Sequence, residues 1–550
     1  MKAVAQPVPR AAQPRTGGEA LVDELLVHDV EVVFGIPSVH NLPIYEALRT
    51  RPRPRHIVCR HEQGAGLMAM GYARVTGRPG VFITSTGPGC LNSATAMGEA
   101  YGDSVPILNV TTERETFLVD RQRGAVHETK DQLGILQRLT IWATRCRAVT
   151  EVPGAIAEAM RQMATGRPRP TAVEVCTDVL GSTAETGLVE PLPVERPAGD
   201  AGLLREAAAV LAKAERPLIW VGGGAIHAEA MEEVRRLAEL LQAPTVTTST
   251  GKGALPDDHP LCLGNLVLHR PVKALLASSD VVLAVGARFS QRGSGEWALP
   301  LPKQLIHIDI DPTVIGANFP TAIGIVADAR LALRQLLQEL DGAVTPRPSR
   351  AGEVAAARAE VARALAERAP TEMAYLAAVR EALPRSGIVA CDPTKWALWG
   401  REHFPVFEPR TWLYPMGFGS LGTGLPWGIG AKVGRPDQPV VVVAGDGGFL
   451  FTATDLATAV QHGIDLAIVL FNDRRYGVIE DLQHARYGKG HEFAVELGNP
   501  DFARFAESFG ARGLRASTPE ALRETLSAAI KAGGVTLIEV PVALQRPFAV

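Results

Sequence analysis

Three signals are weak or missing in this sequence of 550 residues: long apolar runs, a strong net charge and paired cysteines. Apolar runs such as 439–444 and 464–471 have the length of strands. They are far shorter than the ~20 residues that a membrane-spanning helix needs. A formal net charge of −3 gives no electrostatic reason to expect binding to nucleic acid or to a membrane surface. The expected partner is therefore a small molecule.

The cysteines and the N-terminal segment both indicate the compartment. The six cysteines are scattered, with no CxxC pair and no metal-ligand spacing. Such dispersed thiols are typical of a reducing cytosol rather than of a disulfide framework. The first sixteen residues contain three prolines and no apolar stretch long enough for a signal sequence. We therefore expect a cytoplasmic protein in which residues 1–16 form a disordered tail.

What the sequence does contain is one local pattern in three successive blocks. Each block has β-branched runs, glycine-rich turns and helical stretches, a pattern that predicts parallel sheets covered by helices. The blocks cover about 17–185, 200–340 and 370–550, and the segments 186–199 and 342–353 between them have the composition of linkers. The predicted fold class is α/β, with three doubly wound parallel-sheet domains.

Two acidic residues in the third block each follow a buried strand. Asp446 lies in the turn Gly445-Asp446-Gly447-Gly448, and Asp473 is 473 − 446 = 27 positions later, the length of one βαβ unit. The carboxyl ends of neighbouring parallel strands meet at one edge, and carboxylate oxygens suit Mg²⁺. Glycines let backbone N–H groups approach a diphosphate. The pair therefore predicts a magnesium–diphosphate site, whereas an isolated GDG would more simply be a tight turn.

This pattern, GDG followed by Asn472-Asp473, resembles the signature of the thiamine-diphosphate-dependent superfamily of acetolactate synthases and 2-oxo acid decarboxylases. The resemblance implies that Asp446, Asp473 and the backbone carbonyl of Arg475 bind Mg²⁺. Asp473 replaces the asparagine usual in the family, and a carboxylate still coordinates Mg²⁺. The three blocks then correspond to a pyrimidine-binding domain, a central Rossmann-like domain and a diphosphate-binding domain.

A second motif, RHEQGA at 60–65, follows a strand and begins a helix in the first block. It resembles the acetolactate synthase element whose glutamate activates the thiamine ring, which implies that Glu62 is catalytic. A carboxyl group in an apolar pocket suits this role, because burial raises its pKa and helps it share a proton with a ring nitrogen. The alternative is a solvated charge in the first turn of a helix.

Further glycine-rich turns and loops match cofactor-binding elements of the family, although each could also be an ordinary turn between a strand and a helix. Leu421 corresponds to the bulky apolar residue that supports the bent cofactor. The resemblance implies this set of cofactor contacts: Gly87, Pro88, Asn92, Thr394, Lys395, Gly419, Leu421, Gly445, Gly447, Gly448, Tyr476 and Val478.

Two loops bear on the substrate. The RGxxHE stretch at 123–128 lacks the Phe-Gln-Glu element of acetolactate synthases and the paired histidines of pyruvate-decarboxylase types. It is similar to the 5-guanidino-2-oxopentanoate decarboxylase group. His127 is expected to move a proton near the substrate, with a surface histidine as the alternative. Glu480 and Asp481 would suit a cationic guanidinium or amine tail, and an exposed charged helix face explains them equally well.

Three functions follow from these observations. The first is decarboxylation of a 2-oxo acid to an aldehyde through an enamine–carbanion intermediate. The second is carboligation of the acetolactate type, and the third is a catalytically silent homologue, whose expected mark would be loss of Glu62 or of Asp446 and Asp473. The sequence retains all three carboxylates, so it favours an enzyme.

The resemblance also concerns FAD and assembly. Acetolactate synthases bind FAD in the central domain, but Gly222-Gly223-Gly224 is only a weak nucleotide signal, so we expect a central domain without FAD. Glu62 of one subunit is expected to meet Asp446 of its neighbour. This arrangement implies a homodimer, or a homotetramer of paired dimers.

Overall fold

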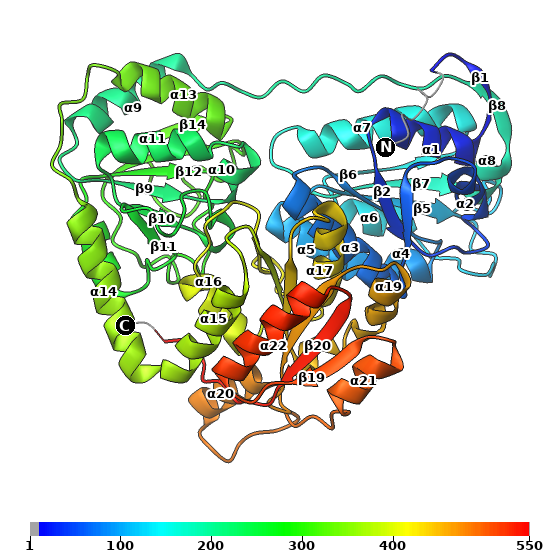
Figure 1. Ribbon diagram of the computed structural model, residues 1–550. Coiled ribbons are helices and arrows are strands. Elements are labelled where there is room, and N and C mark those ends of the chain that lie inside the picture. Colours follow the sequence, from blue (N-terminus) through cyan, green and yellow to red (C-terminus); the bar gives the residue numbers. More distant parts are fainter. Residues whose placement is uncertain (1–9, 549–550) are drawn as a thin grey trace.

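The computed structural model describes residues 10–548, which form three α/β lobes (Figure 1). Each lobe contains a six-stranded sheet, and the strands within these sheets pair in parallel. Parallel sheets need helices on both faces, so their strands are near-continuous apolar runs such as VVVVAG in β17 (Val440–Gly445). The predicted fold class is confirmed.

The first lobe has the strand order β3-β2-β4-β5-β7-β6. Its strands are β2 (Val32–Gly35), β3 (Arg55–Val58), β4 (Gly80–Ile83), β5 (Ile107–Glu113), β6 (Trp142–Cys146) and β7 (Thr171–Cys176). Its helices are α1 (Gly17–Val27), α2 (Leu42–Arg49), α3 (Glu62–Thr76), α4 (Pro88–Asn92), α5 (Ala94–Asp103), α6 (Gln132–Leu139), α7 (Val152–Ala164) and α8 (Thr177–Gly181).

The expectation of a disordered tail up to residue 16 is wrong for its last residues. Strand β1 (Gln13–Thr16) pairs antiparallel with β8 (Thr183–Thr186). The buried Arg15 side chain forms an ion pair with Asp23 at 3.2 Å and donates a hydrogen bond to the Thr186 carbonyl. The partner strand lies about 170 residues away, which is why local composition did not indicate it. Residues 1–9 of the expected tail lie outside the described residues.

The central lobe has the order β11-β10-β9-β12-β13-β14. Its strands are β9 (Pro217–Val221), β10 (Thr245–Thr247), β11 (Cys262–Gly264), β12 (Val281–Val285), β13 (Gln304–Asp309) and β14 (Ile323–Val326), and its helices are α9 (Ala201–Lys213), α10 (Gly223–His227), α11 (Met231–Leu241), α12 (Arg270–Ala277) and α13 (Ala329–Leu340). The first linker crosses between the two upper lobes of Figure 1. The second expected linker, 342–353, extends into the first turn of α14 (Ala351–Arg368), a helix that the sequence analysis had not placed.

The third lobe has the order β16-β15-β17-β18-β20-β19. Besides β17, its strands are β15 (Ile388–Cys391), β16 (Trp412–Leu413), β18 (Leu466–Phe471), β19 (Arg512–Arg515) and β20 (Val535–Val540). Its helices are α15 (Pro370–Ala382), α16 (Lys395–His403), α17 (Gly424–Gly434), α18 (Asp446–Phe449), α19 (Leu456–Gln461), α20 (Gly477–Tyr487), α21 (Phe502–Ser508) and α22 (Pro519–Ala532).

Helices α3 and α17 join the first lobe to the third and lie side by side in Figure 1. Their backbones touch at glycines. A Cβ at Gly430 would lie 1.9 Å from the Met68 carbonyl oxygen, and one at Gly71 would lie 2.3 Å from the Trp427 carbonyl oxygen. Only residues without a Cβ allow this approach. The contact fixes how α3, which begins at Glu62, is placed against the third lobe.

The described residues also bear on the apolar runs and the cysteines. Among residues 10–548, none of the helices is both long and apolar enough to cross a membrane. All six cysteines are buried free thiols, and burial raises the pKa of Cys90 and of Cys146 to about 12. They therefore pack as small apolar side chains rather than act as nucleophiles.

Candidate active site

Asp446 and Asp473 lie at the carboxyl ends of β17 and β18, which are adjacent parallel strands. Asn499 Nδ2 donates a hydrogen bond to Asp446 Oδ2 at 2.6 Å. Burial, and then the charge of Asp446, raise the pKa of Asp473 to about 6. Burial also raises the pKa of Asp446. The two carboxylates therefore destabilise each other's ionised form, and a divalent cation between them would relieve this repulsion.

The glycines around Asp446 let neighbouring side chains approach closely, and one of these side chains carries an unsatisfied acceptor. A Cβ at Gly447 would lie 2.6 Å from Tyr476 Cε1, and one at Gly448 would lie 3.1 Å from Asp392 Oδ2 and 3.6 Å from Leu421 Cδ2. Asp392 Oδ2 is buried without a hydrogen-bond partner among the described residues, and burial raises the pKa of this carboxyl to about 6. Asp392 was not among the predicted contacts, although it directly follows strand β15. A buried orphaned acceptor beside such a turn fits a bound polar group.

Charged side chains around these two carboxylates pair with one another. Lys395 Nζ lies 3.0 Å from Asp481 Oδ2, and Arg475 forms an ion pair with Glu480. Both acidic residues that were expected to face a cationic substrate thus already have a basic partner. A guanidinium tail would have to replace Lys395 or Arg475 as that partner. The Arg475 backbone N–H donates to Asp473 Oδ1 at 3.2 Å, so its peptide is next to the predicted metal position.

Four further residues that were expected to contact the cofactor belong to the third lobe. Thr394 caps α16, where its Oγ1 accepts a hydrogen bond from the Ala397 N–H at 3.1 Å. A Cβ at Gly445 would lie 3.3 Å from Thr394 Cγ2. Val478 is half-buried on α20, and Gly419 lies in an exposed loop with φ of 74°. Thr394 and Gly445 are thus neighbours at the carboxyl edge of the sheet, and the cofactor contacts of all four residues stay a prediction.

The loop that contains Gly419 is held by a residue that sequence reasoning missed. The fully buried Glu99, on α5 of the first lobe, accepts hydrogen bonds from the backbone N–H groups of Phe418 at 3.3 Å and Ser420 at 2.9 Å. Burial raises the pKa of Glu99, followed by the charge of Asp103. No local motif marks Glu99. It fixes the loop from another domain, more than 300 positions away.

In the first lobe, two motifs that the sequence analysis treated separately meet. Glu62 is the first residue of α3, and its Oε2 accepts a hydrogen bond from Asn92 Nδ2 at 3.0 Å. Gly87 and Pro88 begin the short helix that ends at Asn92, and the Gly87 N–H donates to Gln132 Oε1. Among residues 10–548, no hydrogen bond or ion pair joins Glu62 to Asp446 or Asp473.

His127 lies beside a second histidine, His40, with ring centroids 4.9 Å apart. Its Nδ1 is 3.3 Å from the Thr86 carbonyl oxygen. Burial, and then the charges of His127 and Arg114, lower the pKa of His40, whose Nδ1 is buried without a hydrogen-bond partner in the described chain. A histidine pair that is absent as a sequence motif therefore forms in space. The sequence could have indicated this pair only through the positions of the residues along the strands. His40 follows β2, and Thr86, which His127 contacts, follows the adjacent strand β4.

The central lobe borders a cavity of about 510 Å³. Gly222, Gly223 and Gly224 line it, together with Arg167 and Trp220. Arg167 Nη2 and Trp220 Nε1 are buried donors without hydrogen-bond partners in the described part of the chain. Burial, and then the neighbouring guanidinium groups, lower the pKa of Arg167 to about 10. Crowded, unsatisfied donors of this kind fit an anionic ligand, a stronger signal than the three glycines alone.

Comparison with known domain families gives three matches along the chain. Residues 15–135 match the N-terminal TPP-binding domain of thiamine pyrophosphate enzymes. Residues 204–336 match their central domain, and residues 392–540 match their C-terminal TPP-binding domain. Each match falls within one of the three lobes.

Comparison with characterised proteins gives relatives of nearly the same length. A probable 2-ketoarginine decarboxylase of Pseudomonas aeruginosa is 39% identical over 96% of this chain and 95% of its own. A probable acetolactate synthase large subunit of Methanocaldococcus jannaschii is 32% identical over 95% of this chain and 91% of its own. The large subunit of acetolactate synthase isozyme 1 of Escherichia coli is 33% identical over 90% of this chain and 88% of its own.

Proposed function

Because this chain belongs to the family of thiamine pyrophosphate enzymes, we propose that it decarboxylates 5-guanidino-2-oxopentanoate. This acid is also called 2-ketoarginine. The relatives described above are named as a decarboxylase and as acetolactate synthases. 2-Ketoarginine is the substrate in the name of the Pseudomonas aeruginosa relative, which is 39% identical to this chain. That identity, over nearly the whole of both chains, is the observation that carries the proposal. The RGxxHE loop at 123–128, unlike that of acetolactate synthases, supports it.

The donor set at β17 and β18 fits magnesium and a diphosphate. Asp446, Asp473 and the Arg475 carbonyl would hold Mg²⁺, all three being the oxygen ligands that this ion prefers. The turn at Gly447 and Gly448 would bring backbone N–H groups toward the diphosphate. Thiamine diphosphate, when bound, supplies a nucleophilic carbon and an acceptor for the electron pair that decarboxylation leaves behind.

The residues of the first lobe handle protons in this proposal. Glu62 would exchange a proton with the pyrimidine ring, and Asn92, hydrogen-bonded to its Oε2, would orient the carboxyl group. Release of an aldehyde requires a proton at the carbon that lost CO₂. His127 and His40 are the candidate donors, because their rings adjoin each other near the Thr86 carbonyl.

We further propose that the complete site forms between two subunits. Within one chain Glu62 and Asp446 belong to separate groups of contacts, whereas the reaction needs both at one cofactor. A symmetric homodimer supplies two such sites, and pairing of dimers would give a tetramer. The unpaired buried thiols support a reducing compartment, the cytoplasm.

The competing reaction is carboligation. It is favoured by the sequence identity of about one third between this chain and acetolactate synthases. Mass spectrometry of products from separate 2-oxo acids, with and without an added aldehyde, distinguishes the two. We expect 4-guanidinobutanal and CO₂ from 5-guanidino-2-oxopentanoate, and slower turnover of branched and aromatic acids. Acetolactate formed from pyruvate alone, at a rate above that of 4-guanidinobutanal, would contradict the proposal.

The central cavity fits an anionic cofactor such as FAD better than the sequence indicated. Arg167 and Arg288, both lining residues, would hold the diphosphate of such a ligand. The flavin would supply no step of the decarboxylation, so its role would be structural. Visible absorption of the purified protein and chromatography of the nucleotide released on denaturation identify the occupant. A colourless protein that releases no nucleotide would favour the domain without FAD.

A further inference from the structure

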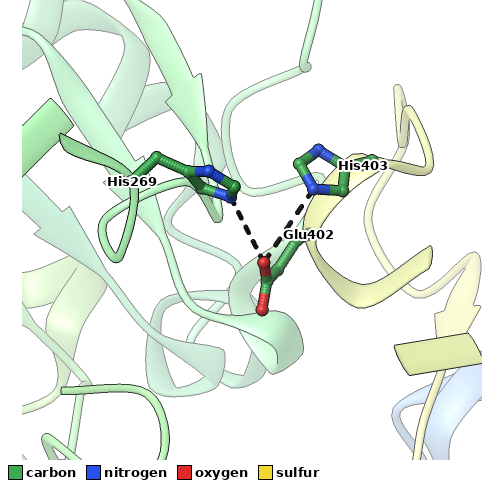
Figure 2. Close-up of side chains that lie close together, drawn as sticks. All are labelled: His269, Glu402 and His403. Carbon is green, nitrogen blue, oxygen red and sulfur yellow. Dashed lines mark hydrogen bonds and ion pairs between the residues drawn. The ribbon is translucent and has the colours of Figure 1, made fainter. Parts of the chain in front are cut away.

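A cluster of two histidines and one glutamate lies where the central lobe meets the third lobe (Figure 2). His269 immediately precedes α12 of the central lobe, whereas Glu402 and His403 end α16 of the third. Their side chains are 0%, 9% and 7% exposed. In Figure 2 the Glu402 carboxylate points between the two imidazole rings. These residues are not part of the motifs that resemble the thiamine site.

The ligand atoms have nearly the spacing of a tetrahedral metal site. Glu402 Oε2 lies 3.3 Å from His269 Nε2 and 3.9 Å from His403 Nε2, and all three atoms lie within 4.8 Å of one another. Zinc bonds of about 2.0–2.2 Å in tetrahedral geometry place neighbouring ligand atoms about 3.3–3.5 Å apart. The Glu402–His269 distance already matches this spacing, whereas His403 has to move closer to the other two ligand atoms for one ion to bind all three.

The hydrogen bonding around the cluster favours an ion over a purely structural arrangement. His403 Nε2 is buried without a hydrogen-bond partner in the described chain, a state that costs free energy unless something binds there. Arg401 binds the other carboxylate oxygen, Glu402 Oε1, at 2.9 Å. It thereby orients Glu402 and leaves Oε2 for the centre of the cluster. Such outer contacts commonly orient metal ligands.

Two neighbouring cations have to be considered, because positive charge opposes a metal ion. Lys252 lies near His403 but is neutralised by Asp257 at 3.1 Å. Arg401 shares its charge with Glu402. Glu402 also lines the central cavity, which gives an ion a route of entry and leaves room for a water ligand in the remaining position.

We propose that His269, Glu402 and His403 form a binding site for a transition-metal ion of the zinc class. Imidazole nitrogens select such an ion over Mg²⁺, so this site is distinct in chemistry from the oxygen-only site at Asp446 and Asp473. The bound ion connects α12 to α16, and therefore the central lobe to the third lobe. Its binding stabilises the folded chain by a free energy that grows with the logarithm of the free ion concentration once this exceeds Kd.

The test uses the full-length protein, freed of transition metals by a chelator and then saturated with Mg²⁺ and thiamine diphosphate so that the oxygen site is filled. Zn²⁺ is titrated while the thermal midpoint is followed, and Co²⁺ is titrated by visible absorption. We expect one saturable equivalent per chain, a raised midpoint and the strong visible bands of tetrahedral Co²⁺. Absence of saturable Zn²⁺ binding by the wild-type protein would overturn the proposal.

Variants assign the site to these residues. His403→Gln is expected to weaken Zn²⁺ binding at least tenfold, since it removes one of three ligands. His259→Gln is the matched control, because His259 also faces a glutamate, Glu239 at 3.3 Å, but has no role in the cluster. His403→Cys should retain binding and add a sulfur-to-cobalt charge-transfer band. Equal Zn²⁺ affinity of His403→Gln and the wild type would contradict the assignment.

Discussion

Glu62 is a residue whose chemistry can be separated from its structural role. The variant Glu62→Gln keeps the size of the side chain and can still bond Asn92, but its amide cannot exchange a proton with a ring nitrogen. General acid–base groups contribute about 10²–10⁴-fold to rates, so we expect kcat to fall by about that factor. Quenching of protein fluorescence by thiamine diphosphate should remain saturable with a similar affinity.

The control for this prediction is Glu46→Gln on α2, an exposed glutamate paired with Arg49. It should leave both kcat and cofactor affinity unchanged, since exposed ion pairs contribute little. Retention of most activity in Glu62→Gln would show that this carboxyl group is not the activating acid.

Asp455 provides a pH-dependent prediction. This fully buried carboxyl accepts a hydrogen bond from the Arg60 N–H at 3.2 Å, while its Oδ2 has no hydrogen-bond partner in the described chain, and burial raises its pKa to about 7. The folded state therefore prefers the protonated form. Its stabilising contribution is complete below pH ~4, the pKa of an unperturbed aspartate, and is lost as the pH rises through about 7.

Asp455→Asn removes this titration. Relative to the wild type, we expect the variant to gain stability progressively between pH ~4 and ~7, by up to about 4 kcal/mol. Thermal unfolding at a series of pH values measures the difference. A stability difference that is flat across this range would show that Asp455 is ionised in the folded protein.

At the scale of elements, the close contact of α3 with α17 is the most sensitive feature. Gly430→Ala would place a Cβ 1.9 Å from the Met68 backbone oxygen, so the helices must move apart. We expect destabilisation on the order of 3 kcal/mol. Calorimetry of thermal unfolding is the appropriate measurement, with the cofactor present in both proteins.

Gly154→Ala on α7 is the matched control, because nothing lies within 4 Å of the added Cβ and the position is exposed. Alanine restricts the unfolded chain and favours a helix, so this change should stabilise by about 0.5 kcal/mol. If both variants lowered the thermal midpoint equally, the packing of α3 on α17 would not be the cause.

Elements in which local pattern and burial agree were predictable from the sequence. The runs that became β17 and β18 are apolar throughout, because both faces of these strands are covered. The segment between these two strands is less regular than the single helix of a simple βαβ unit: the chain forms the four-residue α18, a 3-10 turn at Ala453–Asp455 and then α19. Asp455 joins two of these pieces and contacts Arg60 from the other lobe, a tertiary constraint that helical periodicity cannot express.

At the scale of the whole molecule, the proposed shared site makes a quantitative prediction. Glu62→Gln and Asp446→Asn should each be inactive. In a mixed dimer one site combines both intact residues and the other combines both changes. Random reassociation of equal amounts should therefore restore about a quarter of the wild-type activity. Mixed dimers can be isolated with two affinity tags, and they should have half the wild-type activity.

A site completed within one chain predicts the opposite result, since every chain in the mixture carries one inactivating change. Mixing would then give no activity above that of the separate variants. The measurement also requires proof of exchange, which native mass spectrometry of the tagged dimers supplies.

The sequence by itself determined the α/β class and the three-block organisation, and it predicted Glu62, Asp446 and Asp473 as site residues. These features are local, since each motif spans one strand, one turn and the start of one helix. Tertiary structure alone decided which side chains meet. It placed His40 beside His127, Asn92 on Glu62, and His269 between lobes against Glu402, and it gave Glu480 and Asp481 basic partners. Such contacts depend on strand order and on helix packing between domains, neither of which local periodicity encodes.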